Sequence, residues 1–232
     1  MNKGCRCNKH EECLGKEVEI LLVRHGETTW NVSRRLQGNV VPGPGLTERG
    51  IYQSRCVFKW LDGVGHIYTS PLRRCTETLS HIFSAFGTML NPLPVVQDDG
   101  LKERNLGEFT GCTIDRDIMQ RIKRNEGVET LDELISRSKA TMVGIVKHAL
   151  KRDIEKIMVL SHGGFISSVA RFVDPNKKYH PVSNGSVSRL VACTCNRNQG
   201  ILLWRIDSWN LQSHMITDLG ETSDFGGGSS GG

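Results

Sequence analysis

The sequence predicts an α/β fold: a three-layer α/β/α sandwich with a mostly parallel central sheet and an antiparallel edge strand. Two short, wholly apolar runs at residues 20–23 and 157–160 carry this prediction. Runs of this kind are typical of strands buried on both faces, which occur in parallel sheets covered by helices. Residues 187–194 and 201–207 flank a Gln199-Gly200 turn and predict an antiparallel hairpin at the sheet edge.

The chain of 232 residues is long enough for one large domain, which would bury roughly 70 to 75% of its unfolded surface. We place this domain at residues 18–219. A polar, cysteine-rich segment precedes it at 1–17, and a Gly/Ser-rich tail follows at 220–232, with the composition of a flexible segment.

The composition is that of an ordinary soluble protein. The formal net charge is +5, but basic residues alternate with acidic ones, so the excess charge indicates solubility or an anionic substrate and gives no sign of nucleic-acid binding. No apolar run approaches the roughly 20 residues that span a bilayer, and the N-terminus lacks a secretory core. We expect a cytoplasmic protein without membrane contact, whose cysteines stay reduced.

The N-terminal segment holds four soft metal ligands within nine positions: Cys5, Cys7, His10 and Cys13. Zinc takes thiolates and imidazole readily, so this group could close a tetrahedral site. Its spacing matches no common zinc finger. A tail with reactive thiols is therefore the preferred interpretation, with zinc as the alternative, and we predict no metal in the domain itself.

The first apolar strand ends at Arg24 and His25, and Gly26 then lets the backbone turn away. Ligands of open α/β sheets bind outside the carboxyl ends of the strands, so this basic pair is placed to meet an anion. Residues 28–46 are rich in Gly, Pro and Asn, which predicts a loop over the site.

The next elements repeat this strand-to-helix pattern. Thr47 caps a predicted helix that runs to about residue 61, with Ile51, Val57, Phe58 and Leu61 on its apolar face, and residues 66–69 form a second strand. Ser70 and Pro71 predict a helix that starts at the strand end. Free N–H groups at such a helix start favour phosphate, and an arginine one turn in adds a charged donor.

The second half contains a short strand at 95–96, a basic helix at 112–124 and a longer helix opened by the capping box of Thr130 and Glu133. The apolar face of the long helix predicts core packing by Leu131, Leu134, Ile135, Met142, Ile145, Val146 and Ala149. The basic residues of helix 112–124 indicate a solvated face or contacts to the far end of a substrate. The apolar strand at 157–160 ends in Ser161-His162-Gly163-Gly164, which repeats the arrangement around His25.

Four segments together resemble the histidine phosphatase superfamily, which includes cofactor-dependent phosphoglycerate mutases and fructose-2,6-bisphosphatases. They are Arg24-His25-Gly26-Glu27-Thr28 with Trp30-Asn31, Ser70-Pro71-Leu72-Arg73-Arg74-Cys75, Leu101-Lys102-Glu103-Arg104 and Ser161-His162-Gly163. The resemblance spans about residues 18–215 and implies a phosphoglycerate mutase-like fold.

The resemblance also implies roles for individual residues. His25 would attack phosphorus, and Glu103 would protonate the leaving group, with Glu108 as the competing carboxylate. The phosphate would be bound by Arg24, Arg74, His162, Asn31 and the amide of Gly163, while Gln37 and Gly38 would line the substrate and Glu129 would lie near the site. Residues 40–43, Val-Val-Pro-Gly, depart from members that carry an aspartate there, which leaves the substrate open.

The resemblance favours a phosphatase acting through a phosphohistidine, without metal or cofactor. Its substrate would be a small phosphorylated metabolite of the sugar phosphate, phosphoglycerate or phosphoserine class. Typical mutases carry a long insertion between the acid and the second histidine, whereas 58 residues, 104–161, separate Glu103 from His162 here. A phosphoglycerate mutase and a non-catalytic binding module are the alternatives. The sequence does not set the oligomeric state, and a homodimer remains one option.

Overall fold

A computed structural model describes residues 15–86, 93–194 and 202–215. In this part of the chain, a six-stranded sheet has the order β3-β2-β4-β1-β5-β6. The strands are β1 (Glu17–Arg24), β2 (His66–Thr69), β3 (Val95–Gln97), β4 (Lys156–Ser161), β5 (Val187–Thr194) and β6 (Leu202–Leu211). The first four in sheet order run parallel, and β5 and β6 run antiparallel at one edge. The predicted fold class is confirmed.

Strands β1 and β4 lie side by side at the centre of the sheet, because they carry the two apolar runs. Their parallel register pairs Ile20 with Ile157 and Arg24 with Ser161, so both strands end at the same edge. Residues 20–23 and 157–160 are fully buried. The rigid centre of the sheet therefore sets the positions of the residues that follow each strand.

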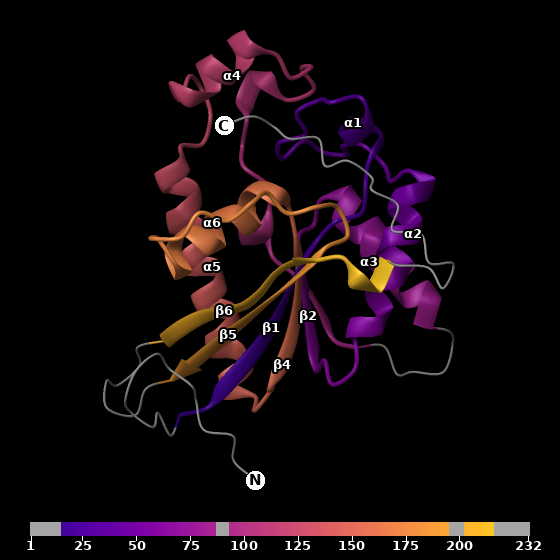
Figure 1. Cartoon of the computed structure of the whole chain (residues 1–232), viewed down its shortest axis with the longest axis vertical. Coiled ribbons are helices and arrows are strands. Elements are labelled where there is room, and N and C mark those ends of the chain that lie inside the picture. The colour runs from indigo at the N-terminus through magenta and orange to yellow at the C-terminus, as the bar shows by residue number, and fades with distance from the viewer. Residues whose placement is uncertain (1–14, 87–92, 195–201, 216–232) are drawn as a thin grey trace.

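Helices cover both faces of this sheet (Figure 1). On one side, α5 (Leu131–Lys151) and α6 (Gly163–Val173) pack over a core that includes Ile20, Val159 and Phe165. On the other side lie α2 (Glu48–Cys56), η1 (Val57–Trp60) and α3 (Arg73–Phe86), over a second core. The remaining short elements are α1 (Thr29–Val32), η2 (Asp99–Leu101), η3 (Gly107–Phe109), α4 (Arg116–Lys123) and η4 (Ser213–Met215).

Several predicted element boundaries were wrong. The loop at 28–46 contains the short helix α1, which Thr28 caps. The helix after Thr47 ends at Cys56 and continues as a 3₁₀ turn, so Phe58 falls on the exposed surface. The helix after Ser70 begins at Arg73, because Pro71 lies in a bend before the first turn.

The second half needs smaller corrections. The basic helix starts at Arg116, four residues later than predicted, where the side chain of Asp115 caps it. Leu131 was placed on the core face of α5, but it is exposed because it lies in the first turn of the helix, whereas Leu134 and Met142 are buried. Strand β6 extends to Leu211, beyond the predicted end at 207.

Some predictions concern residues outside the described ranges. These are the zinc group Cys5, Cys7, His10 and Cys13, the turn at Gln199-Gly200 and the Gly/Ser tail. Within the described ranges, Cys56, Cys75 and Cys112 are free thiols. None of the helices described there combines the length and the apolar character of a membrane span.

Candidate active site

The paired ends of β1 and β4 bring two buried histidines together. The amide of His25 donates to the carbonyl of Ser161 at 3.1 Å, which extends the strand pairing by one residue. The rings of His25 and His162 lie with centroids 5.3 Å apart and tilted by 58°. Two histidines 137 positions apart therefore share one site because the strands that precede them are neighbours.

The ring of His25 is oriented by its own neighbour in the chain. Its Nδ1 lies 2.7 Å from the carbonyl oxygen of Gly26, which can only accept, so Nδ1 carries the proton and Nε2 keeps a free lone pair. Burial lowers the pKa of His25 well below 6.5, and the nearby charges of Arg74 and Arg24 lower it further. At neutral pH His25 is therefore an uncharged imidazole with an available nucleophilic nitrogen.

Both ring nitrogens of His162 are engaged. Nε of Arg74 donates to Nδ1 at 3.0 Å, so the proton of a neutral ring sits on Nε2, which lies 2.8 Å from Oγ of Ser70. Burial and the charge of Arg74 hold the pKa of His162 well below 6.5, with smaller effects from His25, Arg24 and Arg137. His162 is thus fixed in orientation and uncharged at neutral pH.

Two buried arginines supply the positive charge of the site. Arg74, in the first turn of α3, is 1% exposed and also donates from Nη2 to the carbonyl of Gly38 at 2.7 Å. Arg24 donates from Nη1 to the carbonyl of Val182 at 2.6 Å, but its buried Nε has no partner among the described residues. Burial lowers the pKa of both arginines, which remain cations at neutral pH. A buried N–H without a partner, beside a histidine, is suited to bind an anion.

Glu103 reaches this site at the N-terminus of α6. One carboxylate oxygen accepts from the amide of Arg104 at 2.8 Å and the other from the amide of Gly164 at 3.1 Å. A side chain at position 164 would collide with the carboxylate, since a Cβ there would lie 2.3 Å from Oε1. Glu108, the competing carboxylate, lies on the exposed surface and pairs with Arg121 at 2.7 Å.

The other predicted binding residues lie in the loops around this cluster. Oδ1 of Asn31 accepts from the amide and hydroxyl of Thr28 and from Nδ2 of Asn184, which leaves its own amide group as a donor. Oε1 of Gln37 is buried without a partner among the described residues. Gly163 opens α6, and a Cβ there would lie 3.4 Å from Nε of Arg24.

Three further residues contact the side chains of the site, and none of them was predicted to be a site residue. Ser70 has its Oγ 2.8 Å from Nε2 of His162, and the amide of Gly164 donates to Glu103, so both touch a titratable group of the site. Asn184 is a third such residue. Its Nδ2 donates to the carbonyl of His25 at 3.1 Å and bridges to Asn31. No sequence signal identified Asn184, because its role depends on β5 pairing with β1.

Two basic side chains at the C-terminal end of α4 form ion pairs with nearby glutamates. Arg121 pairs with both Glu108 and Glu126, and Arg124 also pairs with Glu126. Arg121 also lies over the ring of Phe109. These contacts agree with the interpretation of a solvated face.

Cys75 lies behind His162, with Sγ 3.6 Å from Nε2. Burial raises the pKa of its thiol to about 12, so it is not a nucleophile at neutral pH. Within the described ranges, no group of three or more His, Cys, Asp or Glu side chains could hold a metal ion. These residues together provide a neutral imidazole that can act as a nucleophile, two arginine cations that can bind an anion, and a nearby carboxylate.

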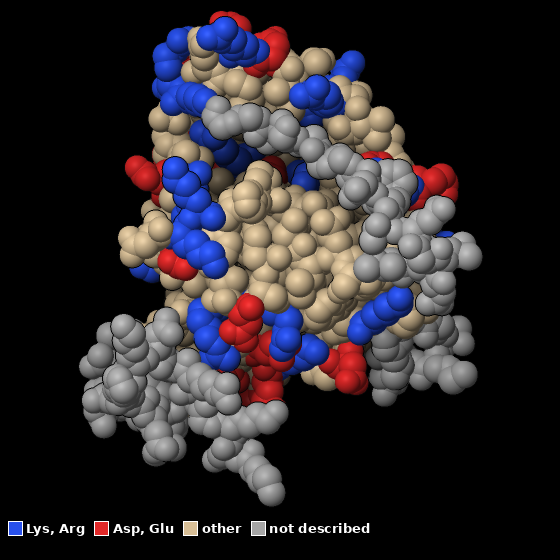
Figure 2. All heavy atoms as spheres, viewed as in Figure 1, with Lys and Arg blue, Asp and Glu red and all other residues tan. Residues whose placement is uncertain are grey.

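The surface is consistent with an anionic ligand. Figure 2 shows Lys and Arg side chains gathered around a hollow in the upper half of the molecule, with a few acidic atoms inside it. In Figure 1 the carboxyl ends of β1 and β4 point toward this half of the molecule.

Comparison with known proteins gives a family match over most of the chain. The sequence model of the "Histidine phosphatase superfamily (branch 1)" matches residues 20–209. The chain is 30% identical to "Phosphoglycerate mutase-like protein 4" of Arabidopsis thaliana, over 90% of this chain and 92% of that protein. It is also 30% identical to "Uncharacterized phosphatase PhoE" of Bacillus subtilis, over 84% and 96% of the two chains.

A third relative is the "Metal-independent phosphoserine phosphatase" of Arabidopsis thaliana, 29% identical over 85% of this chain and 83% of that protein. Among solved structures, a phosphoglycerate mutase from Bacillus anthracis superposes with a TM-score of 0.70 at 21% identity, over 87% of this chain and 96% of that one. At this identity the likeness supports the fold.

Proposed function

The chain belongs to the histidine phosphatase superfamily, and from this premise we propose that it is a phosphatase. It hydrolyses the monoester of a small phosphorylated metabolite through a phosphohistidine on His25, without a metal ion. The substrate classes that we propose are sugar phosphates, phosphoglycerates and phosphoserine. Phosphatase and phosphoglycerate mutase names both occur among the relatives.

The contact between Nδ1 of His25 and the carbonyl of Gly26 is the observation that carries this proposal. Because Nδ1 donates to the carbonyl of Gly26, the nucleophilic lone pair is on Nε2. Two buried arginine side chains lie close enough to lower the pKa of this ring. A phosphate dianion repels nucleophiles, so an uncharged nucleophile beside preorganised cations fits phosphoryl transfer.

In the first step, Nε2 of His25 attacks phosphorus in line with the leaving group. A P–N bond forms, the P–O bond to the substrate breaks, and Glu103 in its acid form gives a proton to the departing alkoxide. Arg24 and Arg74 bind the phosphoryl oxygens. The backbone amide of Gly163 and the side-chain amide of Asn31 are further donors. The incoming dianion also favours protonation of His162 at Nδ1, which adds positive charge as the substrate binds. For this step Nε of Arg74 turns its N–H from Nδ1 to a phosphoryl oxygen.

In the second step, the Glu103 carboxylate takes a proton from water as the water oxygen attacks phosphorus. The P–N bond breaks, His25 returns to its neutral form, and inorganic phosphate leaves. Splitting one displacement in two is the usual advantage of covalent catalysis, and a positioned acid–base group contributes roughly 10²- to 10⁴-fold.

The short segment between Glu103 and His162 favours hydrolysis over mutase activity. In the 58 residues between them, the 3₁₀ turn η3 and the eight-residue helix α4 are the regular elements that precede α5. A mutase must exclude water while the phosphoryl group returns to its substrate, and the chain has little here with which to cover the site.

Phosphate release from a panel of small esters, measured in EDTA, tests the proposal. We expect the wild-type protein to release phosphate and His25→Ala to release none. The rank order of esters then identifies the substrate class. Isomerisation of 3-phosphoglycerate stimulated by 2,3-bisphosphoglycerate would instead support the mutase, and release equal in both proteins would overturn the role of His25. No turnover and no phosphohistidine with any ester would support a binding module.

A further inference from the structure

The segment that carries Glu103 has little regular structure of its own. It runs between the 3₁₀ turns η2 (Asp99–Leu101) and η3 (Gly107–Phe109). Its carbonyls are not paired in a sheet, although backbone polar groups in a folded interior need partners. The position of a proposed proton donor on such a segment depends on whatever holds the segment in place.

Arg137 of α5 provides that attachment. Nη1 donates to the carbonyls of Gly100 at 2.7 Å and Lys102 at 2.9 Å, and Nη2 donates to the carbonyl of Glu103 at 3.4 Å. Nε and Nη2 donate to the two carboxylate oxygens of Glu129 at 2.8 and 2.9 Å. These five contacts use all five N–H groups of the guanidinium, and lysine cannot reproduce that planar arrangement.

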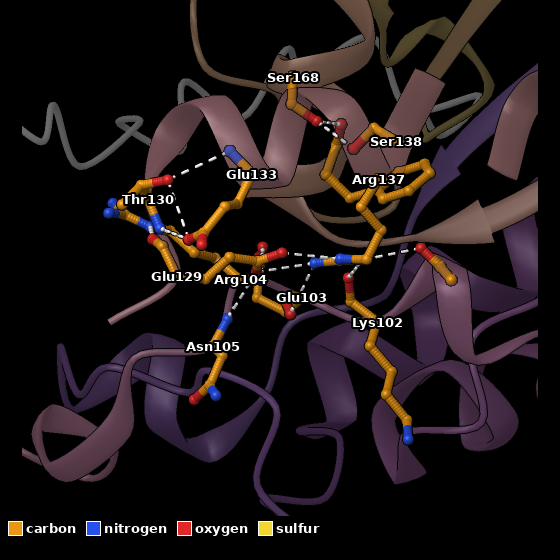
Figure 3. A network of polar contacts seen from close by, with 12 residues as sticks. Lys102, Glu103, Arg104, Asn105, Glu129, Thr130, Glu133, Arg137, Ser138 and Ser168 are labelled. Carbon is orange, nitrogen blue, oxygen red and sulfur yellow. Dashed lines mark hydrogen bonds and ion pairs between the residues drawn. The ribbon is translucent and has the colours of Figure 1, made fainter. Parts of the chain in front are cut away.

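Glu129 binds the far end of the same segment (Figure 3). Its Oε2 accepts from the amide of Asn105 at 3.0 Å, and its own amide donates to the carbonyl of Asn105 at 2.9 Å. Its carbonyl accepts from Nε of Arg104 at 2.6 Å. The side chains of Arg137 and Glu129 are 26% and 14% exposed, so solvent weakens this ion pair less than it weakens a surface pair.

From these contacts we propose that Arg137 and Glu129 form a clamp that positions Glu103 for proton transfer. The inference rests on the proposed function, since it assumes that Glu103 is the acid and base. Both are positioning residues: their contacts are with the segment 100–105 and with each other. Arg137 binds the backbone carbonyls of Glu103 and of residues before it. Glu129 binds the two residues that follow Glu103.

The test compares Arg137→Lys with Glu103→Gln. Lysine keeps the positive charge that lowers the pKa of His162, so the variant removes the planar set of five N–H donors and little else.

Arg189→Lys is the matched control, because Arg189 pairs with Glu19 at 3.2 Å near the opposite end of β1 and is also partly exposed. Glu129→Gln is the second variant, to be used if Arg137→Lys does not fold. Circular dichroism and the inhibition constant for inorganic phosphate report on the fold and on the anion site.

Two esters separate positioning from general damage. An alkyl phosphate needs protonation of its leaving group, whereas 4-nitrophenyl phosphate has a leaving group that departs with little protonation. For Arg137→Lys we expect kcat on the alkyl ester to fall about 10- to 100-fold with KM within about twofold, since a small misplacement of a catalytic group costs about this much. Single-turnover formation of phosphohistidine from the aryl ester should be nearly unchanged.

The double variant sharpens the result. In the Glu103→Gln background, Arg137→Lys should cause no further loss on the alkyl ester, because both changes remove the same proton transfer. Equal losses on both esters, a full additional loss in the double variant, or an unaffected Arg137→Lys would overturn the clamp while leaving the phosphatase proposal intact. If Glu103→Gln itself has no effect on the alkyl ester, the acid assignment fails, and the clamp fails with it.

Discussion

The two strand ends of the site, β1 with His25 and β4 with His162, are built alike and differ in their hydrogen bonds. Both strands are buried and parallel, and a glycine follows each histidine. His25 uses one ring nitrogen, in a bond to Gly26, and keeps the other available. His162 uses both ring nitrogens: Nδ1 accepts from Arg74, and Nε2 is hydrogen-bonded to Oγ of Ser70.

This difference shows that the surroundings of a ring decide its chemistry. Burial and the same arginines lower the pKa of both histidines, so charge alone does not distinguish them. The free lone pair on Nε2 of His25 distinguishes them. In His162, Nδ1 accepts a hydrogen bond from Arg74 and Nε2 carries a proton, so both nitrogens are poor nucleophiles. The proposed roles of nucleophile for His25 and electrostatic partner for His162 follow from this asymmetry.

The largest predicted effect is the loss of phosphoryl transfer in His25→Gln. Removal of a nucleophile should lower kcat by at least about 10⁴-fold, as in other covalent enzymes. Rapid-quench labelling with a ³²P-labelled ester should find acid-labile label in the wild-type protein and none in this variant. Persistent label of the same stoichiometry would show that another residue accepts the phosphoryl group.

His162→Gln should give a smaller loss and keep the label. The amide can accept from Arg74 and donate to Ser70, so the variant preserves the hydrogen bonds and removes the group that we expect to gain a proton as substrate binds. Loss of one preorganised electrostatic contact typically costs roughly 10²- to 10³-fold in kcat. Slow formation of phosphohistidine on His25, measured in a single turnover, is the expected result. Absence of label would mean that the two histidines are equivalent in importance and that the comparison fails.

The buried strands, and the histidines that follow two of them, were located in the sequence from local signals. Apolar runs of four residues identify buried strands, and the carboxyl ends of parallel strands meet at one edge. The site residues Arg74 and Glu103 came from resemblance to known motifs. The structure places both beside the histidines, Arg74 in contact with His162 and Glu103 at the start of the helix that follows it.

The residues that were not predicted act through distant pairing. Asn184 contacts the carbonyl of His25 from a position 159 residues away, and Arg137 contacts Glu103 from a helix whose pattern indicated only packing. A side chain that binds backbone carbonyls far away in the chain does not change the hydrophobic pattern of the sequence around it. Boundaries such as Arg73 and Arg116 depended on bends and capping side chains, which hydrophobic spacing does not register.

The glycines after His162 should differ in their tolerance of a methyl group. In Gly164→Ala, the Cβ would lie 2.3 Å from Oε1 of Glu103 and displace the carboxylate, whereas in Gly163→Ala it would lie 3.4 Å from Nε of Arg24. Alanine favours a helix over glycine by about 1 kcal/mol, so propensity does not oppose either change. We expect kcat on an alkyl ester to fall about 10- to 100-fold for Gly164→Ala and much less for Gly163→Ala. Equal losses would indicate that the Glu103 contact is unimportant.

The smallest effect at neutral pH concerns the shared property of the two histidines, their depressed pKa. Burial, Arg74 and Arg24 hold the pKa of His25 well below 6.5, and burial and Arg74 do so for His162. As the pH falls below about 6.5, the two histidines bind protons in the unfolded chain but not in the folded chain. The free energy of unfolding therefore decreases, until the pH falls below the pKa values of the folded protein. The urea midpoint should therefore drop between pH 7 and pH 5.

The double variant with His25→Gln and His162→Gln isolates the contribution of this pair, because neither glutamine titrates. His66 and His214, whose pKa values burial also lowers, remain in both proteins and contribute equally to both slopes. We expect the midpoint of the double variant to depend less steeply on pH over this window than that of the wild-type protein. Identical slopes would mean that both rings can take up a proton in the folded protein near pH 6.5. An imidazolium at His25 could not attack phosphorus, so that outcome would also remove the uncharged nucleophile on which the proposed function depends.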